Sequence, residues 1–255
     1  MRQLTAAVAV AAIGILVAGC GGGDKGGSAS SSPAGTKTTA PSPSKPPLAQ
    51  AALAGLLLNP AEIDAALGAT GAKPTETTDA LTEDKTASTF SPGYKFPPEC
   101  LYASAAGVAP VYAGSGNTAV HRERDVVSLP PESNDPDPQV NQVVVLFPSP
   151  KEAKAFFENS TKAWPACANR QDTAPADANN PEIHWAVGPV SSANGMLNTT
   201  VSVTVNSNGT STSASCQRAL TVRNNVAIDI EACRKEPGDV AVNIANQIAG
   251  KVDKQ

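Results

Sequence analysis

The pattern of apolar and polar positions divides the chain of 255 residues into three parts. Residues 4–18 are apolar except for Thr5 and Gly14. Residues 21–47 are rich in Gly, Ser, Thr, Pro and Lys, and they carry too few apolar side chains to form a core. Residues 48–255 mix helical and strand patterns, and this part is long enough for one domain with a sizeable core.

A short helix is predicted near the start of the third part, in the sequence NPAEIDAALGA. Asn59 is a good N-cap, Pro60 suits the first helical position, and Gly68 ends the pattern. Glu62 stands three residues after Asn59, which is the spacing of a capping box. We therefore expect a helix that begins at Pro60 and stops at Gly68.

Two longer helices are predicted further along. A buried strand, NQVVVLF from Asn141, leads into SPKEAKAFFENSTKAWPAC, where Ser149 and Glu152 have the spacing of a capping box around Pro150. The inward stripe of this helix is expected to contain Phe156, Phe157, Ser160, Trp164 and Cys167. The last helix is expected to bury Val240, Ile244, Ile248 and Val252. Such stripes are typical of a core rather than of a cofactor site.

Strands fill most of the region between these helices. The segments PEIHWAVGPV and MLNTTVSVTVN have strand patterns, and the dipeptide at 208–209, Asn-Gly, predicts a hairpin turn after the second of them. A further hairpin is predicted in CQRALTVRNNVAIDIEAC.

The register of that last hairpin follows from counting residues. The two asparagines at 224–225 tolerate the positive φ angles of a two-residue turn, so Arg223 would pair with Val226. Counting outward from this pair places Cys216 directly opposite Cys233, at a non-hydrogen-bonded pair where side chains are closest. We therefore expect these two cysteines to form a disulfide.

The same register makes two further predictions. Arg218 falls opposite Glu231, which predicts an opposite-charge pair across the two strands. The apolar side chains of the other face, which we expect to be buried, are Ala219, Val226, Ile228 and Ile230.

The apolar run at the N-terminus, preceded by Arg2, has the layout of a signal peptide. A membrane-spanning helix needs about 20 apolar residues, and this run is shorter and lacks a positively charged stop-transfer flank. We therefore predict a lipoprotein signal peptide over residues 1–19 rather than an uncleaved anchor.

The residues Val17-Ala18-Gly19-Cys20 resemble the bacterial lipobox, in which small residues precede a cysteine that supplies the nucleophilic thiol for lipid transfer. Cys20 is therefore expected to be the lipidated first residue of the mature chain. The lipid would anchor the protein stably if it carries two or more acyl chains. Residues 20–47 would then form a disordered tether at the extracytoplasmic face of the cell membrane. An ordinary secretory signal with an incidental cysteine is the alternative.

Five cysteines are present, and a lipidated cysteine leaves an even number for pairing. The hairpin accounts for two of these, so by elimination Cys100 pairs with Cys167. The alternative is a metal site, which has little support because no C-x-x-C motif occurs and only His121 and His184 could add ligands.

The charge and the sequence motifs limit the classes of function that the protein could have. The net charge is −4 and no basic cluster occurs, which argues against nucleic-acid binding. Ser115 lacks the glycine two residues before it that a nucleophile elbow needs. The sequence GSGNTA is followed by a strand pattern rather than by a phosphate-binding helix. His121 or His184 could act as a base, but neither has a nucleophile motif beside it. We therefore predict no catalytic residue, no metal and no cofactor.

Several segments carry a family resemblance: PPEC, PVYAGSGNTAV, VVVLFPSPKEAKAFFENSTKAWPAC and CQRALTVRNNVAIDIEAC, closed by a terminal helix. Together they resemble the extracytoplasmic sensor domain of the mycobacterial PknH-type kinases, a domain that also occurs alone in many actinobacterial lipoproteins. The resemblance covers most of the chain from about Leu48 onward, so residues 48–255 are interpreted as one domain of this kind.

The resemblance implies an α+β fold in which an antiparallel sheet packs against helices. It also implies two disulfides, joined first to second and third to fourth, and a cleft that binds an unknown ligand. Family members often have an aromatic residue after GSG, where this chain has Asn117, so the ligand preference could differ if that position lines the cleft.

The sequence as a whole predicts a lipid-anchored lipoprotein of the cell envelope with a non-enzymatic ligand-binding or sensor-like domain. Its expected partners are the membrane, through the lipid on Cys20, and a small-molecule or envelope ligand. A carrier of envelope lipids or glycolipids is the alternative and would need a large apolar cavity. A hydrolase is the third possibility.

Overall fold

The computed structural model describes residues 45–133, 135–207 and 209–255. The predicted signal peptide, Cys20 and the predicted tether up to residue 44 lie outside the described residues, and so does Asn208 of the predicted turn. The described residues form one domain built around a single sheet.

The strands of the described residues form one antiparallel sheet, which confirms the α+β class. They are β1 (Lys73–Thr78), β2 (Ala119–Val126), β3 (Gln139–Leu146), β4 (Gln171–Ala174), β5 (Glu182–Val187), β6 (Ser191–Ala193), β7 (Met196–Ser207), β8 (Thr210–Arg223) and β9 (Val226–Arg234). Their order across the sheet is β1-β2-β3-β9-β8-β7-β5-β4, and β6 pairs with β7 beside this path. The last two strands in the sequence therefore lie in the middle of the sheet.

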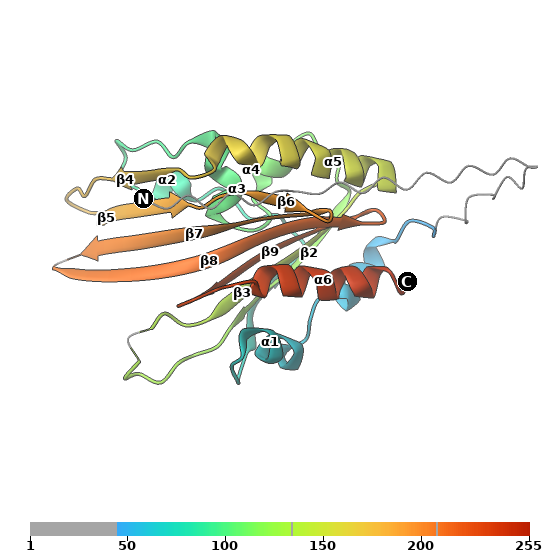
Figure 1. The fold of residues 1–255 in the computed structure, drawn as a ribbon, viewed down its shortest axis with the longest axis horizontal. Coiled ribbons are helices and arrows are strands. Elements are labelled where there is room, and N and C mark those ends of the chain that lie inside the picture. The colour runs from blue at the N-terminus through green and yellow to red at the C-terminus, as the bar shows by residue number, and fades with distance from the viewer. Residues whose placement is uncertain (1–44, 134, 208) are drawn as a thin grey trace, which may run out of the picture. The chain divides into compact units, whose positions relative to one another are not determined.

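Helices cover both faces of the sheet. In chain order, with η for a 3₁₀ helix, they are η1 (Gln50–Leu56), α1 (Pro60–Leu67), α2 (Thr86–Thr89), η2 (Pro98–Cys100), α3 (Leu101–Ser104), α4 (Ala109–Tyr112), α5 (Pro150–Ala163), η3 (Trp164–Cys167) and α6 (Val240–Val252). Helices α2 to α5 lie on one face, whereas α1 and α6 lie on the other (Figure 1).

Side chains alternate between the two faces of the central strands and so contribute to two hydrophobic cores, one on each face of the sheet. Ile228 and Ile230 of β9 are buried on the side of α6, whereas Leu220 of β8 and Ala227 of β9 belong to the core on the side of α5. The predicted stripe of the last helix is confirmed, since its buried residues include Val240, Ile244, Ile248 and Val252. Full burial of each large aliphatic side chain contributes roughly 1.5–3 kcal/mol.

The predicted start and end of α1 are confirmed. The side chain of Asn59 accepts hydrogen bonds from the backbone at Ala61 and Glu62, and the Glu62 carboxylate accepts one from the Asn59 N–H at 2.8 Å. Gly68 ends the helix with a φ of +64°, a conformation that glycine adopts without a Cβ clash.

Helix α5 differs from the prediction at both ends. Ser149 Oγ accepts a hydrogen bond from the Lys151 N–H and bonds to the Glu152 carboxylate, instead of forming the reciprocal capping box. The α-helix stops at Ala163, and Trp164–Cys167 continues as a 3₁₀ turn, because Pro165 has no N–H to donate. Of the predicted stripe, only Phe157 is half-buried rather than buried.

The hairpin register obtained by counting is confirmed. Strands β8 and β9 pair Arg223 with Val226 and Cys216 with Cys233, and Asn224 has a φ of +49°. On the neighbouring hairpin Ser207 pairs with Thr210, as a two-residue turn at 208–209 requires.

Two disulfides occur among the described residues. Cys216 and Cys233 are joined across the β8–β9 pair, with Cα atoms 3.9 Å apart. Cys100 at the end of η2 is joined to Cys167 at the end of η3, with a Cα separation of 5.2 Å. The Cys100–Cys167 bridge fastens the segment before α3 to the 3₁₀ turn that follows α5.

Candidate functional site

A cavity of about 380 Å³ lies between the sheet and the segment that carries α2 and α3. Its sheet wall is a double row of apolar side chains from β5 and β7. The two strands pair residue against residue, and alternation sends every second side chain to this face. The row consists of Ile183, Trp185, Val187, Val201, Val203 and Val205.

Aromatic contacts hold the opposite wall in place. The rings of Phe90 and Phe96 stack with centroids 5.4 Å apart, and Phe96 lies 4.9 Å from the Trp185 ring. The indole N–H of Trp185 donates a hydrogen bond to the Tyr94 hydroxyl at 2.8 Å. Both Phe90 and Phe96 line the cavity, so these contacts hold two of its lining side chains in position.

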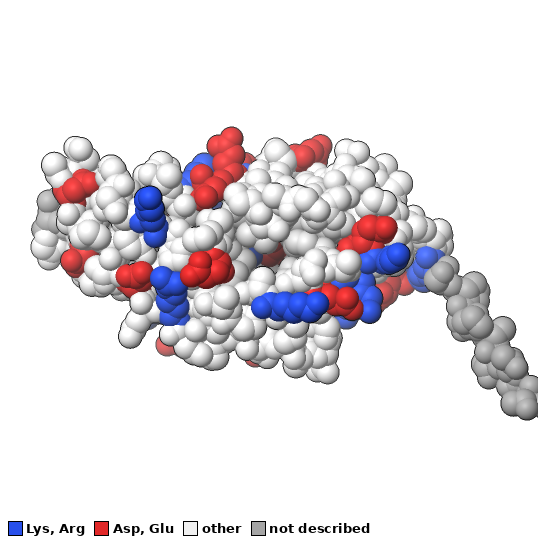
Figure 2. Space-filling view, turned by 90° about the horizontal axis from the view of Figure 1, so that it is seen from above, with Lys and Arg blue, Asp and Glu red and all other residues white. Residues whose placement is uncertain are grey.

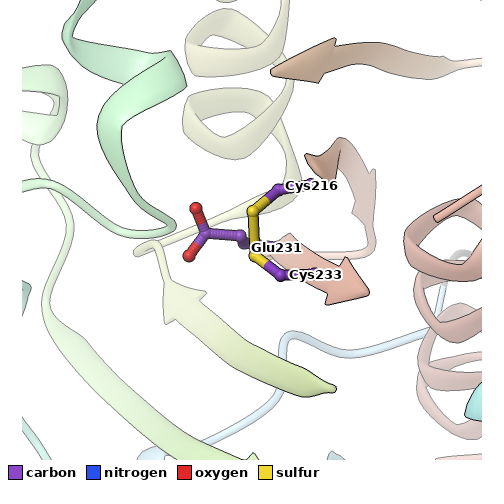
Figure 3. Close-up of side chains that lie close together, drawn as sticks. All are labelled: Cys216, Glu231 and Cys233. Atoms are coloured by element: carbon purple, nitrogen blue, oxygen red, sulfur yellow. A yellow bond between two sulfur atoms is a disulfide. The ribbon is translucent and has the colours of Figure 1, made fainter. Parts of the chain in front are cut away.

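The floor of the cavity combines a carboxyl group with a disulfide. Cys216 and Glu231 both line the cavity, and the Glu231 carboxylate points away from the adjacent Cys216–Cys233 bond (Figure 3). Glu231 is 8% exposed, and its Oε2 accepts a hydrogen bond of 2.6 Å from the Asn141 amide. Burial raises the pKa of the Glu231 carboxyl, although the nearby Arg218 and the Asn141 hydrogen bond act in the opposite direction.

The same three side chains have the composition of a metal site but not its chemistry. The ligand atoms of Cys216, Glu231 and Cys233 lie within 4.8 Å of one another. The two sulfur atoms are bonded to each other, so they are not the free thiolates that bind metal ions. In this oxidised form the group therefore offers a carboxylate alone.

Arg218 does not form the ion pair that the sequence predicted. It stands opposite Glu231 as the register requires, but its guanidinium contacts Asp229 Oδ1 at 2.6 Å. Its remaining hydrogen bonds go to the backbone carbonyls of Tyr102 at 2.9 Å and Ile230 at 2.7 Å. Asp229 lies on the same face of β9 two residues from Glu231, and diagonal cross-strand neighbours are within reach of a long side chain.

Asp229 in turn holds the segment that carries α3 and α4. Its Oδ2 accepts hydrogen bonds from the Gly107 N–H at 2.8 Å and from the Tyr112 hydroxyl at 3.1 Å. Burial raises the pKa of Tyr112 well above its usual value, so this hydroxyl keeps its proton and donates it. The buried network therefore joins the floor strands to the wall across the cavity. Sequence reasoning missed Asp229, although its place two residues from Glu231 was a usable signal.

The candidate catalytic side chains do not converge. His121 lies on β2, and its Nδ1 atom is 2.6 Å from an oxygen of Asp79. The hydroxyl of Ser115, which follows α4, bonds to Asn117. Neither His121 nor Asn117 lines the 380 Å³ cavity, so the position after GSG does not bear on its ligand.

His184 of β5 lies on the opposite, solvent-facing side of its strand. One ring nitrogen contacts the Thr173 hydroxyl at 2.8 Å and the other contacts Glu182 at 2.7 Å. This order of contacts is that of a nucleophile, a base and an acid, but all three side chains stand on an open, solvated strand surface.

Charged side chains are scattered over the molecule. On the face shown in Figure 2, acidic and basic groups are intermingled and separated by wide uncharged areas. At the rim of the cavity Glu83 and Lys85 carry opposite charges.

Comparison with known proteins identifies the fold. The family model described as the PknH-like extracellular domain matches residues 48–251. The chain belongs to the PknH-like extracellular domain family. This match confirms the family resemblance found in the sequence. The domain is therefore an extracytoplasmic domain.

The chain is similar to part of two curated members of this family. It is 32% identical over 217 residues to the serine/threonine-protein kinase PknH of Mycobacterium bovis, a match that covers 84% of this chain and 33% of the kinase. PknH of Mycobacterium tuberculosis matches with the same identity, over 84% of this chain and 32% of the kinase. The chain therefore spans about a third of the length of these relatives.

A solved structure covers the same part of the chain. The crystal structure of the extracellular domain of PknH from Mycobacterium tuberculosis matches with a TM-score of 0.66 and 30% sequence identity. The match covers 82% of this chain and 99% of that chain. Among the residues that the structure describes here, no helix is long and apolar enough to cross a membrane.

Proposed function

We propose that the protein is a lipid-anchored, extracytoplasmic ligand-binding module without enzymatic activity, and that its site is the cavity between β5, β7 and the α2–α3 segment. The observation that carries this proposal is the cavity itself, with an apolar sheet wall, two phenylalanines on the opposite wall and, among the described residues, one buried carboxyl group at its floor. Ligand sites of this size are usually apolar with a few placed polar groups.

The volume favours a small ligand over a lipid carrier. At about 380 Å³ the cavity lies near the lower end of the range of roughly 300–1,000 Å³ that is typical of small-molecule sites. A carrier of envelope lipids has to shield whole acyl chains, which needs more room. A carrier of envelope lipids is therefore the second candidate for this cavity, behind a protein that binds a small ligand.

Val203→Asp is expected to weaken ligand binding by about tenfold or more, because it places a charge on an apolar wall. Val203 pairs with Trp185 in the middle of the sheet wall. The measurement is the fluorescence titration of the purified protein with N-phenyl-1-naphthylamine, a neutral apolar probe, beside native mass spectrometry of retained small molecules.

The matched control is Thr204→Asp, which introduces the same charge one residue further on the opposite face of β7. It should bind the probe like the wild type. Equal binding by the wild type and Val203→Asp, or no binding by the wild type, would contradict the proposed site. Ester hydrolysis that disappears in His184→Ala would instead favour the hydrolase.

Cys20→Ala is expected to abolish lipidation, because it removes the thiol that would receive the lipid. Metabolic labelling with an alkyne fatty acid measures this directly, and the variant should also leave the membrane fraction. Gly22→Ala, two residues further, is the matched control and should be labelled like the wild type. A Cys20→Ala protein that takes up as much label as the wild type would refute the lipobox interpretation.

A further inference from the structure

The charged groups around the cavity differ in depth. Glu83 and Lys85 stand at the rim, whereas Glu231 is 8% exposed and lies at the floor. Both rim side chains are exposed, so water solvates their charges. Glu231 is therefore the charge that a bound molecule would meet inside the cavity.

The two oxygens of the Glu231 carboxylate differ in their hydrogen bonding. Oε2 accepts the hydrogen bond from Asn141, and among the described residues no hydrogen bond reaches Oε1. The guanidinium of Arg218, which stands opposite Glu231 in the strand register, directs its donors to Asp229 and to two backbone carbonyls. Among the residues that the structure describes, Glu231 thus has no direct cationic partner, which a buried carboxylate normally requires.

The apolar wall leads away from this carboxylate. Val201 of β7 pairs with Cys216, whose sulfur lies within 4.8 Å of the Glu231 carboxylate. From Val201 the wall continues along the strand to Val205, a distance of about 13 Å at the usual rise per residue. The sheet wall of the cavity therefore has an acidic end, from which a row of apolar side chains extends.

We propose that the cavity selects an elongated apolar molecule that ends in an ammonium group, with the ammonium against Glu231 and the apolar part along the β7 valines. This inference rests on the proposed ligand-binding function and adds the chemical class of the ligand. An ammonium supplies the missing charge partner and forms charge-assisted hydrogen bonds, which are roughly twice as strong as neutral ones.

Three probes with the same chain and different head groups test the proposal: decylamine, decanol and decanoate. Isothermal titration calorimetry with the purified full-length protein at pH 7 and fixed salt gives each Kd. Decylamine is expected to bind at least about tenfold more tightly than decanol, and decanoate most weakly, because charge-assisted hydrogen bonds outweigh neutral ones.

Glu231→Gln keeps the shape of the side chain and its acceptor for Asn141 but removes the charge. In this variant decylamine and decanol are expected to bind within about threefold of each other, since a neutral hydrogen bond alone distinguishes them. Glu83→Gln is the matched control at the rim and should keep the preference for the amine.

The possible outcomes separate the two proposals. If wild-type protein binds decanol as tightly as decylamine, or binds decanoate most tightly, the ammonium inference is wrong although the apolar site stands. If Glu231→Gln keeps the full preference, the inference is also wrong. If none of the three probes binds the wild type, both the inference and the proposed function fail. The ranking on the wild type decides even if Glu231→Gln does not fold.

Discussion

Arg218→Met is expected to lower the free energy of unfolding by about 3–5 kcal/mol, the usual cost of removing one partner of a buried ion pair. Arg218 is fully buried, and it satisfies Asp229 Oδ1 together with two backbone carbonyls. The substitution would leave the Asp229 carboxylate buried with only its two hydrogen bonds from Gly107 and Tyr112. Urea denaturation followed by circular dichroism measures the loss.

Arg223→Met is the matched control on the same strand. Arg223 is part-exposed at the hairpin end, and its contact to Asp253 is 3.9 Å long, so its loss should cost less than about 1 kcal/mol. The double variant Arg218→Met/Asp229→Asn should recover part of the stability, because it removes the unpaired charge. An Arg218→Met protein as stable as the wild type would show that the network does not hold the wall to the sheet.

Asp125→Asn is expected to stabilise the protein at pH 7 by about 1–3 kcal/mol, given that each pKa unit corresponds to about 1.4 kcal/mol. Asp125 is fully buried on β2, and only its Oδ2 accepts a hydrogen bond, from the Gln142 amide at 3.0 Å. Burial raises the pKa of this carboxyl from 3.8 to about 6, with the Gln142 hydrogen bond acting in the opposite direction.

The sign follows from proton linkage. The folded state holds the Asp125 proton more tightly than the unfolded chain, so the free energy of unfolding falls as pH rises between about 4 and 6. The contribution is present at acid pH and lost above pH 6. Denaturation of wild type and Asp125→Asn from pH 4 to 7 should therefore converge at the acid end and diverge at the neutral end.

Glu132→Gln is the control for this prediction, because it removes one carboxylate from an exposed position. Its stability should follow the wild type at every pH. If the difference between Asp125→Asn and the wild type does not change with pH, the buried carboxyl does not titrate in this range.

Features set by local sequence were predictable. The turn at 224–225 determined the register of β8 and β9, because a two-residue loop leaves one way to pair the strands. The same holds for α1, whose cap residues all lie within a few positions. The end of α5 was also a local matter, and the prediction overlooked that Pro165 interrupts the backbone hydrogen bonds.

The cavity depends on contacts that no local pattern encodes. Phe96 meets Trp185, and Tyr102 meets Arg218, from positions about a hundred residues apart in the sequence. The alternating pattern of β7 predicted a strand, but not that its valines would face a cavity rather than a filled core. The choice of Asp229 over Glu231 as the partner of Arg218 likewise depends on side-chain reach across a twisted sheet.

The position of β8 and β9 in the middle of the sheet has a consequence for folding during synthesis. Synthesis delivers β1, β2 and β3 first, then β4 to β7, and these two groups contact each other in the sheet only through the strands made last. Until residue 234 has emerged, both groups expose an unpaired strand edge beside apolar side chains. A nascent or truncated chain is therefore a natural client for chaperones, and truncations before β9 should aggregate rather than form a smaller domain.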